Sequence, residues 1–433
     1  MRKKSKDSII IGLALFAMFF GAGNLIFPPA IGFASASQWP LSMLGFFLTG
    51  IGMPLLGILA VTISGGSLKT LTSKVNNKFY MIFGSLVILL IGPMIAIPRT
   101  GATAFEMGIL PNFSFINSYM SALIFFGITL LLTIKPTGII DRIGKFLTPV
   151  LLTMLSIIII KGIMNPIGQP ATSTLETAFS FGFTQGYQTM DLLGAIVFGA
   201  LITTAAREKG YEHRKDSFHV TAKAAFIAAF GLLTIYGGLL YLGATGSSLL
   251  VEQTKAQLII DIVYRILGIS GQAILGLGVY AACLTTSVGL TATVGNFFSE
   301  LTDHKLSYRF IVILTTAISA VASTTGVETI VSFASPILVV IYPMAIVLVV
   351  LNVFDNFIAY QSIYKGALMG TFSISIFDGF KAAGIQMPSI VNSFIESLPL
   401  FGIGFGWLLP AVIGSIIIVG YSKMTSSVVK SVE

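Results

Sequence analysis

Charged residues are scarce in this sequence. Only 10% of its 433 residues are Asp, Glu, Lys or Arg, whereas soluble domains carry about 25%. A chain with so few charges cannot cover a water-facing surface. The composition therefore excludes a soluble enzyme, a nucleic-acid-binding protein and a disordered scaffold.

Cysteine and histidine are nearly absent. The one cysteine, Cys283, lies within an apolar segment, so no disulfide can form within the chain. The three histidines, His213, His219 and His304, lie in or beside expected loops and lack the spacing of metal ligands. The sequence has no His-Glu-x-x-His set and no nucleophile paired with a base. We expect no enzyme activity, no cofactor and no transition metal.

Hydrophobic residues are abundant instead. They make up 55% of the chain, and the mean hydropathy is +0.93. Twelve membrane helices of about 20 residues each would need this amount. Apolar stretches long enough to span a bilayer occur at about 8–36, 40–64, 79–105, 118–135, 144–163, 172–206, 218–245, 268–300, 308–326, 330–353, 366–384 and 401–421. The sequence predicts an all-α polytopic membrane protein with about 12 transmembrane helices.

The positive charges are unevenly distributed along the chain. About 20 of the 25 Lys and Arg fall at the two termini and in alternate loops. The opposite loops hold only Lys161, Lys255, Arg265 and Lys381. This asymmetry predicts that both termini are cytoplasmic. The net charge of +8 therefore indicates topology, and we expect no nucleic-acid partner.

The first apolar span is interrupted by glycines and prolines. It contains the run Gly21-Ala22-Gly23-Asn24-Leu25-Ile26-Phe27-Pro28-Pro29. Proline lacks a backbone N–H and is tolerated best in the first turn of a helix. We expect an unwound stretch at about 21–27 and a second half-helix that begins near Pro28. Unwound backbone cannot face lipid, so it must be packed in protein or line a wet cavity.

The sixth span is interrupted in the same way. Its run is Phe181-Gly182-Phe183-Thr184-Gln185-Gly186-Tyr187-Gln188-Thr189-Met190-Asp191. We expect a break near 182–190, with Thr189 or Asp191 capping the second half-helix. The alternative for either run is a kink that only adjusts helix packing.

The two breaks lie five predicted spans apart. Five spans reverse the direction of the chain across the membrane, so two such units form an inverted repeat, and paired breaks mark the binding site of a transporter. We expect a first five-helix repeat at 1–165, a second at 166–356, and two further helices with a cytoplasmic tail at 357–433.

At these breaks the sequence resembles a known family. Residues 17–29 and 186–191 resemble the bacterial branched-chain amino acid:cation symporters (the LIVCS, or BrnQ-type, carriers), and the resemblance covers essentially the whole chain. The first run is also similar, more distantly, to the broken first helix of LeuT-type sodium symporters. The resemblance implies a LeuT-type fold with a 5+5 inverted repeat, discontinuous helices 1 and 6, and two extra helices. It also implies import of Leu, Ile and Val across a bacterial cell membrane, with no obligatory protein partner.

The breaks suit an amino-acid zwitterion. The start of a half-helix offers free N–H groups and a positive dipole end to a carboxylate, and the end of one offers carbonyl oxygens to a cation or an ammonium. Glycine lets a ligand approach the backbone closely. The predicted substrate-binding residues are Gly21, Ala22, Gly23, Asn24, Gly186 and Tyr187.

The eighth span carries hydroxyl side chains that suit sodium, a hard cation that prefers oxygen ligands. In LeuT-type symporters, one sodium site joins carbonyls of the first helix to a carbonyl and hydroxyls of the eighth. The resemblance therefore implies a sodium site drawn from Ala17, Phe20, Ala282 or Cys283, and two of Thr285, Thr286 and Ser287. The alternative is that each hydroxyl only bonds back to a carbonyl one turn earlier.

Three charged residues lie in or near the spans. Asp191, at the neck of the sixth span, is either a coupling group for protons or an acid stabilised by a helix dipole. Arg99, inside the third span, either attracts substrate, forms an outer gate with Glu106, or extends its side chain to the interface.

These observations predict a secondary active symporter that couples sodium to branched-chain amino acids by alternating access. Two alternatives keep the fold: coupling to protons, or transport of another amino acid or a nucleobase. A channel, which would give single-channel currents and no accumulation against a gradient, and an intramembrane enzyme are the less favoured alternatives.

Overall fold

The structure is a computed structural model that describes residues 2–134, 139–211, 213–251 and 253–430. Within those ranges the chain is helical between short connections and contains no β-strand. The first part of the chain forms α1 (Arg2–Phe19), α2 (Ala22–Ser35), η1 (Ala36–Gln38), α3 (Trp39–Phe47), η2 (Leu48–Gly52), α4 (Met53–Ile63), α5 (Leu68–Thr72), α6 (Asn77–Leu89), η3 (Leu90–Met94), α7 (Ala96–Thr103), η4 (Ala104–Ile109), α8 (Ser118–Thr133) and α9 (Ile139–Met164). The rest forms α10 (Ala178–Gln185), η5 (Gly186–Thr189), α11 (Asp191–Glu208), α12 (Arg214–Gly246), α13 (Lys255–Leu301), α14 (Tyr308–Ser323), α15 (Val327–Val353), η6 (Asp355–Phe357), α16 (Ser362–Ala382), α17 (Ser389–Glu396), η7 (Phe401–Ile403) and α18 (Leu408–Lys430).

Each predicted span coincides with helical structure, although the predicted end of the fourth, residue 135, lies outside the described ranges. Five helical runs are long and apolar enough to cross a membrane, and the bent pair 178–189 and 191–208 makes a sixth. Shorter apolar helices occur at Ser118–Thr133, Leu152–Met164, Tyr308–Ser323 and Leu408–Ser422. The chain is thus an all-helical, multi-pass membrane protein, and the count of twelve spans stays a prediction.

Polar side chains determine where several helices begin. Asn76, Asn117, Thr254 and Ser307 each accept a hydrogen bond from the backbone N–H three residues later. This bond satisfies one of the N–H groups that the first turn of a helix leaves without a partner. These caps therefore mark where α6, α8, α13 and α14 begin.

The break in the first span is shorter than predicted. Gly21 is extended, at φ −113° and ψ −167°, and α2 already begins at Ala22. The prediction of an unwound stretch over 21–27 was wrong, because Pro28 and Pro29 lie inside α2 and not in its first turn. The Asn24 side chain accepts from the Gly21 N–H and thereby starts the helix early. The prolines cost α2 the hydrogen bonds of two N–H groups but do not end it.

The break in the sixth span is confined to its last predicted residues. Residues 182–185 belong to α10, and a 3₁₀ turn, η5, follows. Met190 then takes the left-handed conformation, with φ +60°, and α11 leaves at 45° to the preceding helix. The predicted cap was wrong, because Met190 occupies the position before α11 and provides no side-chain cap. The Thr189 hydroxyl, one residue earlier, accepts from the Asp191 N–H at 3.3 Å.

A further irregularity lies in the third span, which the sequence predicts to be continuous. Gly92 is non-helical, with φ −96° and ψ −128°, and a new helix, α7, begins at Ala96. This kink lies seven residues before Arg99 and turns α7 away from the direction of the preceding helix.

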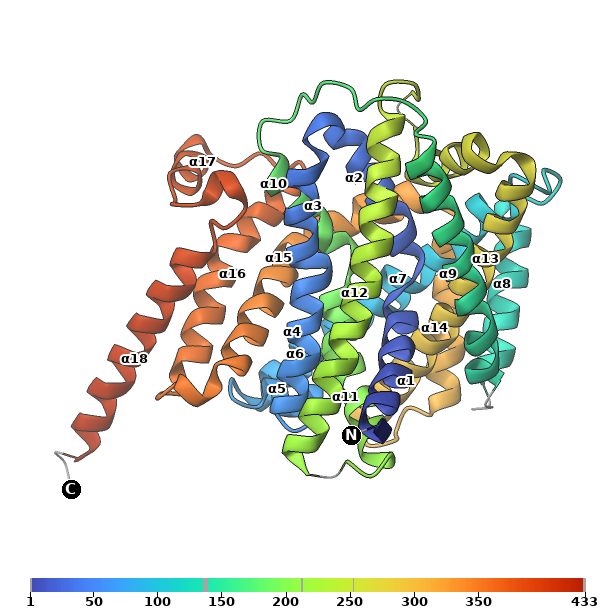
Figure 1. Cartoon of the computed structure of the whole chain (residues 1–433). Coiled ribbons are helices and arrows are strands. Elements are labelled where there is room, and N and C mark those ends of the chain that lie inside the picture. The colour runs from blue at the N-terminus through green and yellow to red at the C-terminus, as the bar shows by residue number, and fades with distance from the viewer. Residues whose placement is uncertain (1, 135–138, 212, 252, 431–433) are drawn as a thin grey trace.

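The long helix α12 contacts both halves of the first span (Figure 1). A β-carbon at Gly32 would lie 1.8 Å from the Leu240 carbonyl oxygen, and one at Gly243 would lie 2.0 Å from the Pro29 carbonyl oxygen. Only glycine permits such close approach, which is how helices commonly pack in membranes. α12 therefore braces the first span around its break.

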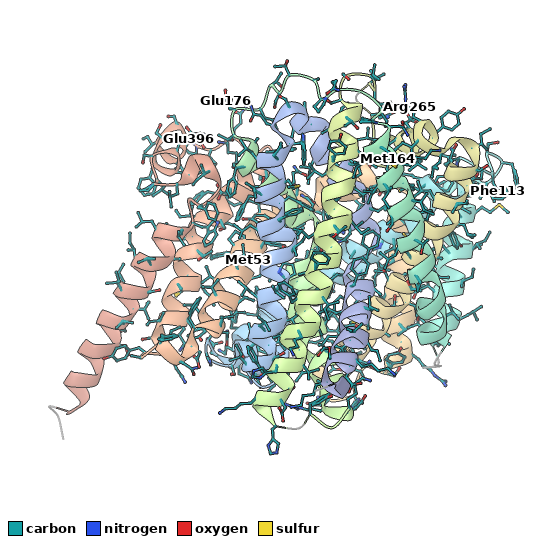
Figure 2. The ribbon with its side chains drawn as sticks, viewed as in Figure 1. Met53, Phe113, Met164, Glu176, Arg265 and Glu396 are labelled. Carbon is teal, nitrogen blue, oxygen red and sulfur yellow. The ribbon has the colours of Figure 1, made fainter. Side chains whose placement is uncertain are left out.

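The two ends of the described chain lie at the same end of the helical bundle (Figure 1). Glu176, Arg265 and Glu396 lie at the opposite end (Figure 2). This arrangement agrees with an even number of crossings. Large apolar side chains face outward along the helices, such as Leu123 and Leu131 on α8 and Ile416 on α18, which are 66–76% exposed. Such a surface suits lipid and not water.

Candidate functional site

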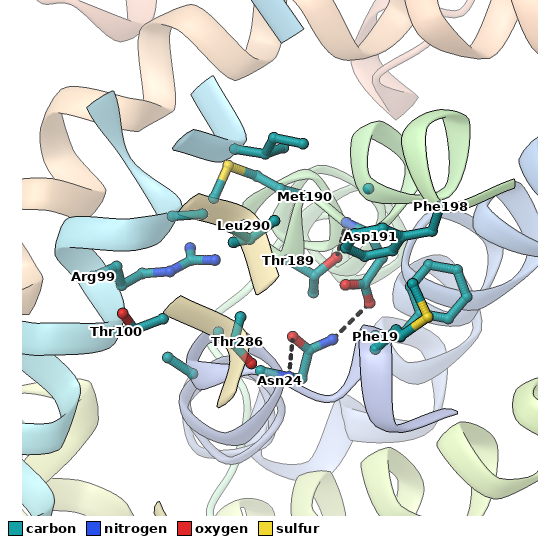
Figure 3. A pocket seen from close by; sticks show the side chains of 17 residues that line it. Phe19, Asn24, Arg99, Thr100, Thr189, Met190, Asp191, Phe198, Thr286 and Leu290 are labelled. Atoms are coloured by element: carbon teal, nitrogen blue, oxygen red, sulfur yellow. Dashed lines mark hydrogen bonds between the residues drawn. The ribbon is translucent and has the colours of Figure 1, made fainter. Parts of the chain in front are cut away.

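One cavity meets both helix breaks (Figure 3). It lies where the end of α1, the start of α2, α7, the start of α11 and the middle of α13 come together. Its lining residues are Met18, Phe19, Gly21, Ala22, Gly23, Asn24, Ile91, Ala96, Arg99, Thr100, Thr189, Met190, Asp191, Gly194, Phe198, Thr286 and Leu290. A pocket between helices that is mostly apolar and holds a few polar groups is the usual form of a small-molecule site.

Asn24 ties the two breaks together. Its side-chain nitrogen donates to Asp191 Oδ2 at 2.6 Å and to the Tyr236 hydroxyl, while its oxygen accepts from the Gly21 N–H at 3.4 Å. The Tyr236 hydroxyl also donates to Asp191 Oδ2, at 3.3 Å. The side chains of Asn24 and Asp191 are 2% and 5% exposed. A buried network of this kind fixes the relative positions of α2, α11 and α12.

Arg99 reaches the same cavity from α7. Its Nη1 donates to the Gln188 carbonyl at 2.7 Å, and the guanidinium carbon lies 5.4 Å from the centre of the Phe27 ring. A β-carbon at Gly23 would lie 2.6 Å from Arg99 Nη2, so the guanidinium rests against the start of α2. The side chain is 3% exposed and does not extend to an interface.

The half-helix ends have backbone groups to offer. In a continuous helix the Gly21 N–H would bond to the Ala17 carbonyl, but here it donates to Asn24 Oδ1. The break therefore deprives the Ala17 carbonyl of its helical partner, and the last carbonyls of α1 have no partner within that helix.

The eighth-span hydroxyls point in different directions. A β-carbon at Gly21 would lie 3.6 Å from Thr286 Oγ1, so Thr286 reaches the first break. Thr285 donates to the Ala282 carbonyl at 2.9 Å, so its hydroxyl bonds back to its own helix one turn earlier. Ser287 is buried and accepts from Thr129 on α8 at 3.4 Å.

Several predicted site residues do not line the cavity. A β-carbon at Gly186 would lie 2.0 Å from Thr49 Oγ1, so this glycine packs against η2. The Tyr187 ring stacks on Tyr342 with centroids 4.4 Å apart. Ala17, Phe20, Ala282 and Cys283 are also outside the lining. Their expected contribution is a backbone carbonyl, and it stays a prediction.

Glu106 lies in a different environment from Arg99. Its Oε1 accepts from the Val327 N–H at 2.8 Å, at the start of α15. A carboxylate at this position stabilises the first turn of a helix. In this conformation Arg99 donates to the Gln188 carbonyl instead, and the outer-gate pairing stays a prediction.

The sequence did not predict several other residues at the site. Tyr236 comes from the middle of an unbroken apolar helix, and Phe198 and Leu290 are apolar residues among many. Nothing in the local sequence distinguishes them. The sequence predicted a break in the run that contains Met190, but it did not predict that Met190 borders the cavity.

The sequence matches proteins of one kind along its length. Residues 4–425 match the family model described as "Branched-chain amino acid transport protein". The branched-chain amino acid permease BraB of Bacillus subtilis is 40% identical over 421 residues, which cover 95% of this chain and 94% of that protein. The branched-chain amino acid transport system 2 carrier protein of Pseudomonas aeruginosa is 36% identical and covers 96% of both chains.

The fold matches solved transporter structures. Mhp1, a nucleobase-cation-symport-1 family transporter in a closed conformation with bromovinylhydantoin bound, gives a TM-score of 0.62 at 14% identity, covering 96% of this chain and 93% of that one. MhsT in complex with L-phenylalanine gives 0.54 at 16% identity, covering 94% and 97%. At these identities the likeness shows the fold alone, which is of the LeuT type. From its sequence match and its fold, the chain belongs to the family of branched-chain amino acid transport proteins.

Proposed function

We propose that this protein is a secondary active symporter that imports leucine, isoleucine and valine together with sodium. The observation that carries the proposal is the cavity at which both helix breaks meet. Binding sites of this kind, at the junction of two repeats, allow one site to open to either side of a membrane in turn. The names of the relatives support the choice of cargo.

The substrate backbone would bind at the helix breaks. The start of α2, at Ala22 and Gly23, would present N–H groups and a positive dipole end to the carboxylate. The end of α1 presents carbonyl oxygens to the ammonium. The side chain would contact the apolar lining, including Phe19, Phe198 and Leu290. One methylene is worth only about 1–3 kcal/mol in such a pocket, so Leu, Ile and Val should compete.

Sodium would bind between the first and eighth spans. Its ligands would be the Ala17 and Phe20 carbonyls and oxygens of residues 282–287 on α13. Thr286 supports this site because it reaches Gly21. Thr285 contributes less, because its hydroxyl donates to the Ala282 carbonyl at 2.9 Å. Ser287 contributes less, because its hydroxyl contacts Thr129.

Proton coupling is a second candidate mechanism. Asp191 is a buried carboxylic acid that lines the cavity. It lies at the break of the sixth span, and Asn24 connects it to the break of the first span. Ionisable groups within membrane segments are commonly functional. In this case the proton would bind at Asp191, and the α13 hydroxyls would serve helix packing.

The test is uptake of labelled leucine into proteoliposomes under a sodium gradient or a proton gradient, applied separately. We expect accumulation with sodium alone, and competition by isoleucine and valine but not by alanine. Accumulation with protons alone would transfer the coupling role to Asp191. No accumulation under either gradient would contradict the proposed cargo.

The proposed setting is a bacterial cell membrane with both termini in the cytoplasm. The distribution of Lys and Arg supports this orientation. Inverted repeats at 1–165 and 166–356 would rock against each other, with 357–433 outside the repeats. The breaks at Gly21 and Met190 support this division, since they occupy the first span of each proposed repeat.

A further inference from the structure

Two buried side chains of opposite charge face the cavity from different helices. Arg99 comes from α7 and Asp191 from the start of α11, and they enter the cavity from opposite sides in Figure 3. They are 3% and 5% exposed. Among the ion pairs of the described residues, none joins these two groups. Buried charges are normally paired, because an unpaired charge in a low-dielectric site is costly.

Arg99 retains donors for a ligand. A guanidinium has five N–H donors in a planar fork that suits carboxylates. Within the described part of the chain, its hydrogen bond is the one from Nη1 to the Gln188 carbonyl, and Nε has no partner. Nη2 lies against Gly23, beside the first N–H groups of α2. A carboxylate here would meet both the guanidinium and the helix start.

Asp191 is held in place by one of its two oxygens. The hydrogen bonds that its side chain accepts from Asn24 and Tyr236 both reach Oδ2. The carboxylate is therefore oriented from the side of α2 and α12, and it borders the same cavity as Met18 and Phe19 at the end of α1. An ammonium here would meet a carboxylate and the last carbonyls of α1 together.

We propose that Arg99 and Asp191 bind the two charged groups of the substrate, Arg99 the α-carboxylate and Asp191 the α-ammonium. This inference rests on the proposed function and adds the residues that make the site specific for a zwitterion. A free amino acid is the ligand that neutralises both charges at once, whereas a molecule with one charge leaves the other buried charge uncompensated. The pair thus selects for an intact amino-acid backbone, while the apolar lining contacts the side chain.

The test compares leucine with two analogues that each lack one charged group. 4-Methylpentanoate lacks the ammonium, and 3-methylbutylamine lacks the carboxylate. Binding to the purified full-length protein is measured by competition with labelled leucine. In the wild-type protein we expect both analogues to bind at least about 100-fold more weakly than leucine. Binding of either within tenfold of leucine would overturn the proposal without any variant.

The variants should show a crossed pattern. Arg99→Gln should weaken leucine binding by about 30-fold or more and leave the affinity for 3-methylbutylamine within threefold. Asp191→Asn should weaken leucine equally and leave the affinity for 4-methylpentanoate within threefold. If each variant weakens leucine and both analogues by the same factor, the residues are structural and the proposal fails.

Two controls remove a charge far from the cavity. Arg265→Gln and Glu176→Gln alter exposed side chains at one end of the bundle (Figure 2), and both should bind leucine as the wild type does. Monodispersity on size exclusion reports folding of every variant. If Asp191→Asn changes only the sodium requirement and keeps the full preference for leucine over 4-methylpentanoate, Asp191 is a coupling residue and the assignment is wrong. If the wild type binds no branched-chain amino acid, the proposed function itself fails.

Discussion

At the scale of single residues, the site depends on side chains and glycines that allow two helix breaks to touch. The Asn24 side-chain amide is both donor and acceptor: its nitrogen donates to Asp191 and its oxygen accepts from the Gly21 N–H. An aspartate at this position could not donate to Asp191, and a leucine could do neither. Gly23 has the complementary role of leaving room for Arg99.

Gly23 provides the sharpest steric prediction. In Gly23→Ala the new β-carbon would lie 2.6 Å from Arg99 Nη2, so the guanidinium must move away from the start of α2. We expect leucine binding to weaken by at least about tenfold, which corresponds to about 1.4 kcal/mol. Competition binding on the purified protein measures it.

The matched control is Gly127→Ala on α8, where a β-carbon meets nothing within 4 Å. This variant should bind leucine normally and be more stable, since alanine favours a helix over glycine by about 1 kcal/mol. Normal leucine affinity in Gly23→Ala would contradict the proposed placement of the carboxylate beside Gly23.

Thr286 and Ser287 are neighbours with different surroundings, and sodium dependence should separate them. Thr286→Ala removes the hydroxyl that reaches Gly21, so we expect the sodium concentration for half-maximal uptake to rise about tenfold or more. Ser287→Ala should have a smaller effect, because its hydroxyl contacts Thr129. Thr234→Ala, at an exposed back-bonded threonine, is the control. Unchanged sodium dependence in Thr286→Ala would remove it from the site.

At the scale of elements, the sixth span is broken by one residue in an unfavourable conformation. Met190 has φ +60° and lies between η5 and α11. The left-handed region costs a residue with a β-carbon about 1–2 kcal/mol, and such strain persists where surrounding structure enforces it. Here Asp191, the next residue, is held by Asn24 and Tyr236.

Replacing Met190 by glycine and by alanine should reverse the usual order of stability. Both changes remove the side chain, but only glycine removes the cost of a positive φ. We expect Met190→Gly to unfold at a higher temperature than Met190→Ala, by about 1 kcal/mol in stability, in thermal unfolding of the purified protein. At helical Gly127 alanine should be the more stable residue. A more stable Met190→Ala would mean that residue 190 is helical in solution.

At the scale of the whole molecule, the close contact of helices depends on small residues and not on charge. Gly32 and Gly243 bring α2 and α12 together without intervening side chains. The outer surface remains apolar, with side chains such as Leu131 and Ile416 mostly exposed. Lys and Arg gather at the termini and in alternate predicted loops, which predicts the orientation of the bundle in the membrane.

This orientation can be tested by labelling from outside intact cells. Single cysteines would be placed at Glu176 and at Lys78, both exposed, in a Cys283→Ala background that removes the buried native thiol. A membrane-impermeant maleimide should label residue 176 in intact cells and residue 78 only after permeabilisation. The reverse pattern would invert the topology and assign the termini to the outer side.

Much of this protein was determined by local sequence. Apolar runs of membrane length specify helices, because only a helix satisfies its backbone hydrogen bonds within lipid. The interrupted stretches at 21–29 and 181–191 predicted that helices 1 and 6 are irregular, since glycine tolerates conformations that other residues avoid. The family resemblance depended on the same two runs, and the comparisons confirmed it.

Only the tertiary structure decided which residues meet. Asn24 and Asp191 are 167 positions apart, and Asn24 and Tyr236 are 212 apart, and no local pattern encodes these pairs. The length of the first break also depended on a side chain, since Asn24 starts α2 before Pro28. Likewise, Thr286 faces the break and Ser287 faces α8 because of how α13 is rotated against its neighbours. Backbone preferences act over a few residues, whereas the cavity is made by packing between helices distant in sequence.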